Sequence, residues 1–173
     1  MATNSGPALS HGPVLYARKG HVALITLNRP GAGNAIDRDA AAALNDICQT
    51  INQDSEVRVA VIRGAGDKAF CLGEDPAILS GGAAGGPPPP ATRAELGLRR
   101  NVAEMVSGIE CPVIAAVNGD ALGAGLALAL ACDLRIASAG ALFGIGDTAR
   151  DCLLANGLTQ LLPRVVGRGK AME

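Results

Sequence analysis

The sequence predicts an α/β protein in which strands and helices alternate within one domain. Short apolar segments rich in β-branched residues alternate with longer segments whose apolar residues recur at helical spacing, which is typical of a layered sheet. Two of the expected strands, residues 59–62 and 113–117, resemble each other, and a glycine-containing turn follows each of them. Such repetition favours a coiled superhelix, although the spacing alone does not distinguish it from a doubly wound sheet. The chain has 173 residues, 49% of them hydrophobic, which suits one substantial core but not two independent domains.

The first predicted elements are a hairpin and a helix. The apolar segments 14–17 and 22–28 lie on either side of a Lys-Gly pair, an arrangement typical of two antiparallel strands joined by a tight turn. A helix is predicted over residues 39–53, because apolar residues recur there every three or four positions. Asp37 or Asp39 can cap the N-terminus of this helix.

Strands and helices continue to alternate through the rest of the chain. Short apolar segments predict buried strands at residues 57–63, 112–117 and 133–137. The further helices are expected at residues 123–131, at residues 156–162 and from about Arg168 onward.

Two segments are expected to lie outside the packed core. Residues 1–12 are predicted to form a loose N-terminus. Residues 80–92 consist mostly of glycine, alanine and proline, so we expect a flexible insertion there. Because helical periodicity resumes within residues 95–106, the insertion interrupts a single domain spanning residues 1–173 rather than separating two domains.

Composition excludes several classes of partner. The net charge is −1, from 15 basic and 16 acidic residues, so neither nucleic acid nor an anionic membrane would be attracted strongly. The N-terminus lacks the features of a secretory signal, and the most apolar segment, residues 122–132, is too short to cross a bilayer. Five cysteines without a CxxC pair suit reduced thiols in the cytoplasm and no metal site.

The start of the helix expected at residues 123–131 is the strongest candidate for a binding site. Gly123 and Gly125 bracket this start, which lies between two apolar strands. The first N–H groups of a helix have no partner within it and lie at its positive end, so they suit an anion or a developing oxyanion. The alternative is that the glycines serve only tight packing at a strand-to-helix turn.

Four segments in order carry a resemblance to a known family: residues 22–37, 58–75, 111–138 and 157–173. They read VALITLNRPGAGNAID, RVAVIRGAGDKAFCLGED, CPVIAAVNGDALGAGLALALACDLRIAS and GLTQLLPRVVGRGKAME. Together they resemble the crotonase superfamily, the enoyl-CoA hydratase and isomerase family. The resemblance implies a superhelix of repeated strand-strand-helix units whose usual C-terminal helical region is absent here. It also implies acyl-CoA thioesters as substrates, no further cofactor or metal, and a homo-oligomer, either a trimer or a dimer of trimers.

The resemblance assigns roles to individual residues. In the family two backbone N–H groups hold the thioester oxygen as an enolate forms, and these positions fall on Glu74 and Ala124. Arg29 and Lys68 would lie near the CoA phosphates, or else are solvated surface charges. The remaining residues that the resemblance places at the substrate or its CoA moiety are Ala32, Gly33, Ala35, Cys71, Gly73, Asp75, Asp120 and Gly123.

Departures from the family pattern bear on the reaction. Hydratases of this family carry two glutamates, and the first of these positions is occupied by Ala127 here. The second position falls on Asp147, which is the candidate base. The alternatives are that Asp147 only caps a helix, or that Asp151 is the base in its place. One carboxylate beside an oxyanion site suits proton transfer α to a thioester, so isomerase-like or decarboxylase-like chemistry is favoured over hydration.

A second hypothesis is a catalytically weak or inactive homologue that binds acyl-CoA or serves as an assembly subunit. Ala127 and the missing C-terminal region favour this hypothesis. Two further departures add to it: the Cβ of Ala124 can crowd the thioester, and the Glu74 carboxylate lies beside an anionic site unless it points to solvent. The buried environment expected for Cys71 makes a nucleophilic role less expected than a packing role.

Overall fold

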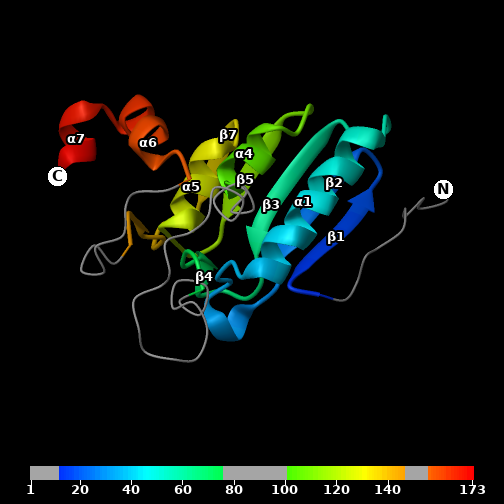
Figure 1. The fold of residues 1–173 in the computed structure, drawn as a ribbon, viewed down its shortest axis with the longest axis horizontal. Helices are drawn as coiled ribbons and strands as arrows, with labels where there is room; N and C mark the ends of the chain where they lie inside the picture. Colours follow the sequence, from blue (N-terminus) through cyan, green and yellow to red (C-terminus); the bar gives the residue numbers. More distant parts are fainter. Residues whose placement is uncertain (1–11, 76–100, 147–155) are drawn as a thin grey trace, which may run out of the picture.

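The structure is a computed structural model that describes residues 12–75, 101–146 and 156–173 (Figure 1). The predicted insertion at residues 80–92, the candidate base Asp147 and all but the last residue of the expected N-terminal segment lie outside these ranges. Figure 1 shows the N-terminal hairpin and the helix α1 at one end of the molecule, and the C-terminal helices α6 and α7 at the other.

The main sheet has five strands in the order β1-β2-β3-β5-β7. Strands β1 and β2 form the predicted antiparallel hairpin, and every later strand joins in parallel to the one before it in this order. The two similar apolar segments noted in the sequence become the neighbouring strands β3 and β5. The five strands are Val14–Lys19, Val22–Leu27, Val59–Gly64, Val113–Val117 and Leu134–Ala137.

A second, smaller sheet lies beyond the carboxyl ends of the parallel strands. Its strands β4, β6 and β8 are parallel to one another, in that order. The sequence did not predict this sheet, because strands of two or three residues are too short to show a period of two. The three strands are Ala69–Cys71, Asp120–Leu122 and Phe143–Gly144.

The helices begin where the sequence supplies caps or glycines. Asp37 caps α1 by accepting a hydrogen bond from the N–H of Ala40, and Asn101 caps α4 through Ala103 and Glu104. The helices α5 and α6 instead follow glycines with positive φ, Gly123 and Gly157. The helical segments are η1 (Pro30–Ala32), α1 (Arg38–Gln53), α4 (Val102–Ser107), α5 (Ala124–Ala131), α6 (Leu158–Val166) and α7 (Arg168–Met172).

The repeating unit confirms the predicted superhelix. Each unit contributes one strand to the main sheet, then one to the small sheet, then a helix, as in β5-β6-α5 and β7-β8-α6. A shortened version occurs after β2, where a single residue, Ile36, forms a parallel bridge to Glu74 before α1 begins. The carboxyl ends of the parallel strands therefore meet the small sheet, which is where α/β folds commonly bind ligands.

Burial is uneven along the main sheet. The alternate residues of β3 and β5 that face the core are fully buried, and α1 covers the hairpin side with Leu44, Ile47 and Ile51. Every residue of the edge strand β7 is exposed, including Leu134 and Ile136. Within the described ranges, no helix combines the length and the apolar character needed to cross a membrane.

Candidate active site

The segment that follows β4 is fixed by backbone hydrogen bonds to the segment that follows β2. Leu72 donates to the carbonyl of Gly33 at 3.0 Å, Ile36 donates to Gly73 at 2.9 Å, and Asp75 donates back to Ile36 at 2.9 Å. In this parallel bridge, Ile36 bonds to the residues on either side of Glu74. The N–H of Glu74 therefore points away from Ile36, and no residue in the described part of the chain accepts a backbone hydrogen bond from it.

The second candidate donor lies at the start of α5. Gly123 enters the helix with φ 50° and ψ −118°, a conformation that favours glycine, and its own N–H donates to Gly144 at 3.0 Å. The first hydrogen bond of the helix runs from Ala127 to the carbonyl of Gly123. The N–H of Ala124 is therefore one of the helix's unpaired first donors, at the positive end of the helix dipole.

Glycines bring these two backbone segments together. A Cβ added to Gly73 would lie 3.7 Å from the amide nitrogen of Ala124, and one added to Gly123 would lie 3.7 Å from the Cα of Gly73. Gly146 approaches from a third side, since its Cβ would lie 3.5 Å from the nitrogen of Gly123. The N–H groups of Glu74 and Ala124 thus sit on adjoining stretches of main chain, a geometry that suits a shared oxygen acceptor.

Gly125 sets how closely α5 approaches β4. A Cβ at this position would overlap the carbonyl oxygen of Cys71 and lie 2.8 Å from its carbonyl carbon. Only a glycine allows the helix start to pack this tightly against the strand. This glycine-bracketed helix start therefore has the tight packing that the sequence offered as one alternative, and it also leaves the N–H of Ala124 without a partner in the helix.

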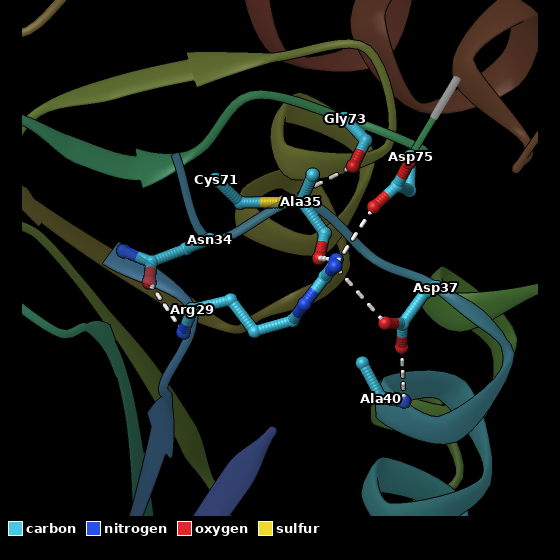
Figure 2. Close-up of polar contacts among 8 residues, drawn as sticks. All are labelled: Arg29, Asn34, Ala35, Asp37, Ala40, Cys71, Gly73 and Asp75. Atoms are coloured by element: carbon cyan, nitrogen blue, oxygen red, sulfur yellow. Dashed lines mark hydrogen bonds and ion pairs between the residues drawn. The ribbon is translucent and has the colours of Figure 1, made fainter. Parts of the chain in front are cut away.

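Arg29 forms the charged centre of the loop that follows β2 (Figure 2). Its Nη2 lies 2.8 Å from Oδ2 of Asp75 and 3.1 Å from Oδ2 of Asp37, while its Nη1 donates to the carbonyl of Ala35 at 2.7 Å. Asp37 uses its other oxygen to accept from the N–H of Ala40, capping α1 at 2.7 Å. The sequence offered a phosphate contact or a solvated charge for Arg29; in the structure the guanidinium pairs with two carboxylates of its own chain.

Asn34 is the buried polar residue that the sequence did not single out for its side chain. It is 1% exposed and adopts φ 55°, a left-handed conformation that asparagine tolerates better than most residues. Its Oδ1 accepts from the N–H of Arg29 at 3.0 Å, and its Nδ2 donates to Ala65 at 3.0 Å and to Ala69 at 2.8 Å. One amide therefore joins the β2 loop to both ends of the connection between β3 and β4.

The side chain of Glu74 is tied to a neighbouring element. Its Oε1 accepts from Nδ2 of Asn156 at 3.2 Å, and Oδ1 of Asn156 accepts in turn from the N–H of Val102 at the start of α4. The carboxylate is thus part of a polar link across the structure, in addition to lying beside the candidate oxyanion donors. Asn156 itself adopts φ 56°, immediately before Gly157 and α6.

The Cys71 side chain has the buried packing role that the sequence favoured over a nucleophilic one. The thiol is fully buried in the core, and its Sγ lies 3.7 Å from the carbonyl of Gly73. Burial raises the pKa of the Cys71 thiol to about 12, so the thiol stays neutral near pH 7 and is no nucleophile. A contact between substrate and residue 71 would have to involve the main chain.

The other predicted site residues occupy varied places. Ala32 lies exposed in η1, whereas Oδ1 of Asp120 accepts from the N–H of Leu142 at 3.1 Å and so helps to hold β8. Lys68 is exposed beside a surface cavity of about 240 Å³. Ala127, at the position of the missing glutamate, is fully buried in a small apolar cluster with Leu158.

Comparison with known proteins gives a consistent family. The family model for enoyl-CoA hydratase/isomerase matches residues 17–173. The (E)-benzylidenesuccinyl-CoA hydratase of Thauera aromatica is 41% identical over 93% of this chain, and the crotonyl-CoA hydratase of Syntrophomonas wolfei is 36% identical over 95% of it. The chain spans 60% and 62% of the length of these two relatives.

Solved structures agree with the sequence comparison. The crystal structure of an enoyl-CoA hydratase from Bacillus anthracis matches with a TM-score of 0.81 and 37% identity, covering 92% of this chain and 60% of that one. The residues matched by the family model include both backbone segments of the candidate site. This chain belongs to the enoyl-CoA hydratase/isomerase family, the crotonase superfamily.

Proposed function

We propose that the protein binds acyl-CoA thioesters and stabilises the enolate that forms when a proton is removed from the carbon next to the carbonyl. The observation that carries this proposal is the meeting of two backbone segments, in which Gly73 lies against the amide nitrogen of Ala124. In the proposed reaction the N–H groups of Glu74 and Ala124 donate to the thioester oxygen as negative charge develops on it. Donors fixed beforehand need no reorganisation, and each contributes about 3 kcal/mol to transition-state stabilisation.

We favour proton transfer with one carboxylate over hydration. Hydration in this family uses two carboxylates, and Ala127 occupies the place of one of them in an apolar cluster that would bury an added charge. The base that we propose is Asp147, by its position in the sequence. It would remove a proton from the substrate and return it at another carbon, which is isomerisation, or protonate the enolate left by decarboxylation.

The direct test is exchange of the α-proton. Butyryl-CoA incubated with the protein in D₂O should lose its α-proton signal in the NMR spectrum, and 3-enoyl-CoA should isomerise faster than crotonyl-CoA is hydrated. Asp147→Asn should lower both exchange and isomerisation by about 100-fold or more, because a general base contributes that much. Hydration faster than exchange and isomerisation would overturn the one-carboxylate reaction.

A second candidate function is acyl-CoA binding without catalysis, for example as an assembly subunit. The exposed apolar residues of β7 and β8, among them Leu134, Ile136 and Phe143, favour association with other subunits. Calorimetric binding of butyryl-CoA without any proton exchange would support this candidate. If neither CoA nor butyryl-CoA binds, both functions fail.

We also propose a cytoplasmic homo-oligomer, a trimer or a dimer of trimers. The free thiols Cys48, Cys71, Cys111 and Cys132 suit a reducing compartment, and the exposed edge strand offers an apolar surface for association. Light scattering coupled to size-exclusion chromatography gives the mass of the particle directly. A monomer at micromolar concentration would contradict the oligomer.

A further inference from the structure

We propose that Arg29 is a positioning residue: through Asp75 and Ala35 it fixes the loop that presents the Glu74 N–H to the thioester oxygen. This inference rests on the proposed function, because it assigns a task to a residue that would not itself touch the substrate. It replaces the phosphate contact that the sequence offered for Arg29.

The guanidinium holds the loop after β4 to the loop after β2. Nη2 lies 2.8 Å from the Asp75 carboxylate, and Nη1 donates to Ala35 at 2.7 Å (Figure 2). Ala35 directly precedes Ile36, whose N–H and C=O bond the residues on either side of Glu74. Arg29 therefore contacts both strands of the one-residue bridge that orients the Glu74 N–H.

The loop needs such a restraint because glycine precedes the donor. Gly73 adopts φ 108°, a region that few other residues enter, and glycine has more conformational freedom than any other residue. The Asp75 side chain lies two residues beyond Gly73, so an ion pair there limits rotation about the glycine. Charge-assisted hydrogen bonds in a partly buried setting are stronger than neutral ones.

Neighbouring residues hold both the backbone and the side chain of Arg29. Its backbone N–H donates to the buried Asn34 at 3.0 Å, and its side chain meets Asp37, which caps α1. The planar fork of arginine can donate to a carbonyl and a carboxylate at once, whereas a lysine ammonium on a flexible stem cannot reproduce that arrangement. Lysine should therefore replace Arg29 only in part.

The charges around Arg29 also argue against a phosphate contact. Two carboxylates lie within 3.1 Å of Nη2, so the guanidinium charge is already compensated by its own chain. A phosphate brought to the same place would be repelled by Asp37 and Asp75. The two roles make opposite predictions about CoA affinity and turnover.

The experiment compares Arg29→Gln, Arg29→Lys and Asp75→Asn with Arg18→Gln as a matched control. Arg18 forms a similar ion pair at 3.1 Å with Asp54, which follows the C-terminal end of α1, whereas Arg29 pairs with Asp37 at its N-terminal end. Arg29→Gln should lower kcat for isomerisation about 30- to 100-fold, since a donor displaced by about 1 Å costs that much. The KM and the Kd for CoA should change less than about threefold, and Arg29→Lys should recover part of the loss. Arg18→Gln should leave kcat unchanged.

Hydrogen exchange gives a second readout that does not need turnover. The backbone amides of Ile36 and Asp75, which bond across the bridge, should exchange about tenfold faster in Arg29→Gln and Asp75→Asn than in the parent protein, but not in Arg18→Gln. The double variant Arg29→Gln with Asp75→Asn should be no worse than either single one, because both act through the same contact.

Three outcomes separate the alternatives. A weaker Kd for CoA with unchanged kcat would overturn the positioning role and make Arg29 a phosphate ligand. Unchanged kcat and unchanged exchange at Ile36 and Asp75 would overturn it outright. If the parent protein shows no turnover, the proposed function fails, and the exchange rates alone decide whether Arg29 fixes the loop.

Discussion

The two backbone donors of the candidate site, the N–H groups of Glu74 and Ala124, lie in differently built surroundings. Around Glu74 the loop is held by polar and charged side chains, namely Arg29, Asp75 and the buried amide of Asn34. Around Ala124 the helix α5 carries no charged residue, and all but one of its eight residues are buried. One donor is thus held in place by charge and hydrogen bonds, and the other by close packing at glycines. We expect the first to respond to changes of polarity and the second to changes of volume.

The largest expected effect tests whether close packing at glycines holds the N–H of Ala124 in place. Gly125→Ala places a methyl group on the main chain of Cys71, so the start of α5 must move away from β4. Overpacking of this kind costs about 3 kcal/mol, and the displaced donor should lower turnover about 100-fold. Chemical denaturation and the α-proton exchange assay measure the two effects.

Gly140→Ala is the matched control, because a Cβ there meets open space and no positive φ. It should change the free energy of unfolding by less than about 0.5 kcal/mol. If Gly125→Ala behaves like this control, close packing is not what positions Ala124.

The next effect tests the hydrogen bonds that hold the loop around Glu74. Asn34→Ala removes three hydrogen bonds and leaves the N–H of Arg29 and the carbonyl of Ala65 without their partner, while the carbonyl of Ala69 keeps only the longer bond from Asn118 at 3.4 Å. We expect a loss of about 2 kcal/mol in the free energy of unfolding, since unsatisfied buried groups are costly. Asn52→Ala serves as the control: Asn52 also joins separate segments, through Gly108 and Glu110, but water can replace its exposed bonds. Equal losses in the two variants would contradict a special role for the buried amide.

Alkaline pH should lower the free energy of unfolding through buried thiols such as that of Cys71. Burial raises the pKa of Cys71 to about 12 from 9.0, so above pH 9 the unfolded chain releases this proton and the folded chain keeps it. Stability from this group is complete below pH 9 and falls by about 1.4 kcal/mol per pH unit between pH 9 and 12. Cys71→Ala should remove about 1 kcal/mol of the fall in unfolding free energy between pH 9 and 10, measured by urea titration. An unchanged slope would mean that the thiol ionises in the folded state.

The smallest effect concerns the side chain of Glu74 rather than its backbone N–H. Glu74→Gln keeps the N–H and keeps an oxygen for Asn156, so stability should change by less than about 1 kcal/mol and turnover by less than about threefold. The pH profile of kcat should stay the same. A loss above tenfold together with a lost ionisation in that profile would instead make the Glu74 carboxylate the base of the reaction, in place of Asp147.

The long helices and strands were predicted well from the sequence, because in each of them the spacing of apolar residues repeats several times. The helix expected at residues 39–53 begins at Arg38 and ends at Gln53, capped by one of the two aspartates named for it. The small sheet was missed, since Ala69–Cys71 and Phe143–Gly144 are too short to show any period. Its existence depends on pairing between segments far apart in the chain.

The candidate site was predictable where glycine patterns mark it and unpredictable where it depends on tertiary partners. Gly73 and Gly123 lie close together, and the residues that follow them, Glu74 and Ala124, are those that the family resemblance implied as donors. Their role as oxyanion donors stays a prediction. Arg29 and Asp75 are 46 residues apart in the chain, so no local sequence pattern predicts their ion pair. Asp147 lies outside the described residues and stays a prediction.

The single-residue bridge between Ile36 and Glu74 has an evolutionary consequence. A donor supplied by the main chain is present whatever side chain the codon specifies, provided that the backbone can keep its shape. Residue 74 can therefore vary between acidic, amide or small side chains without loss of the donor. Substitutions are constrained instead at the neighbours that shape the bridge, so the side chains around the donor can change while the donor itself is kept.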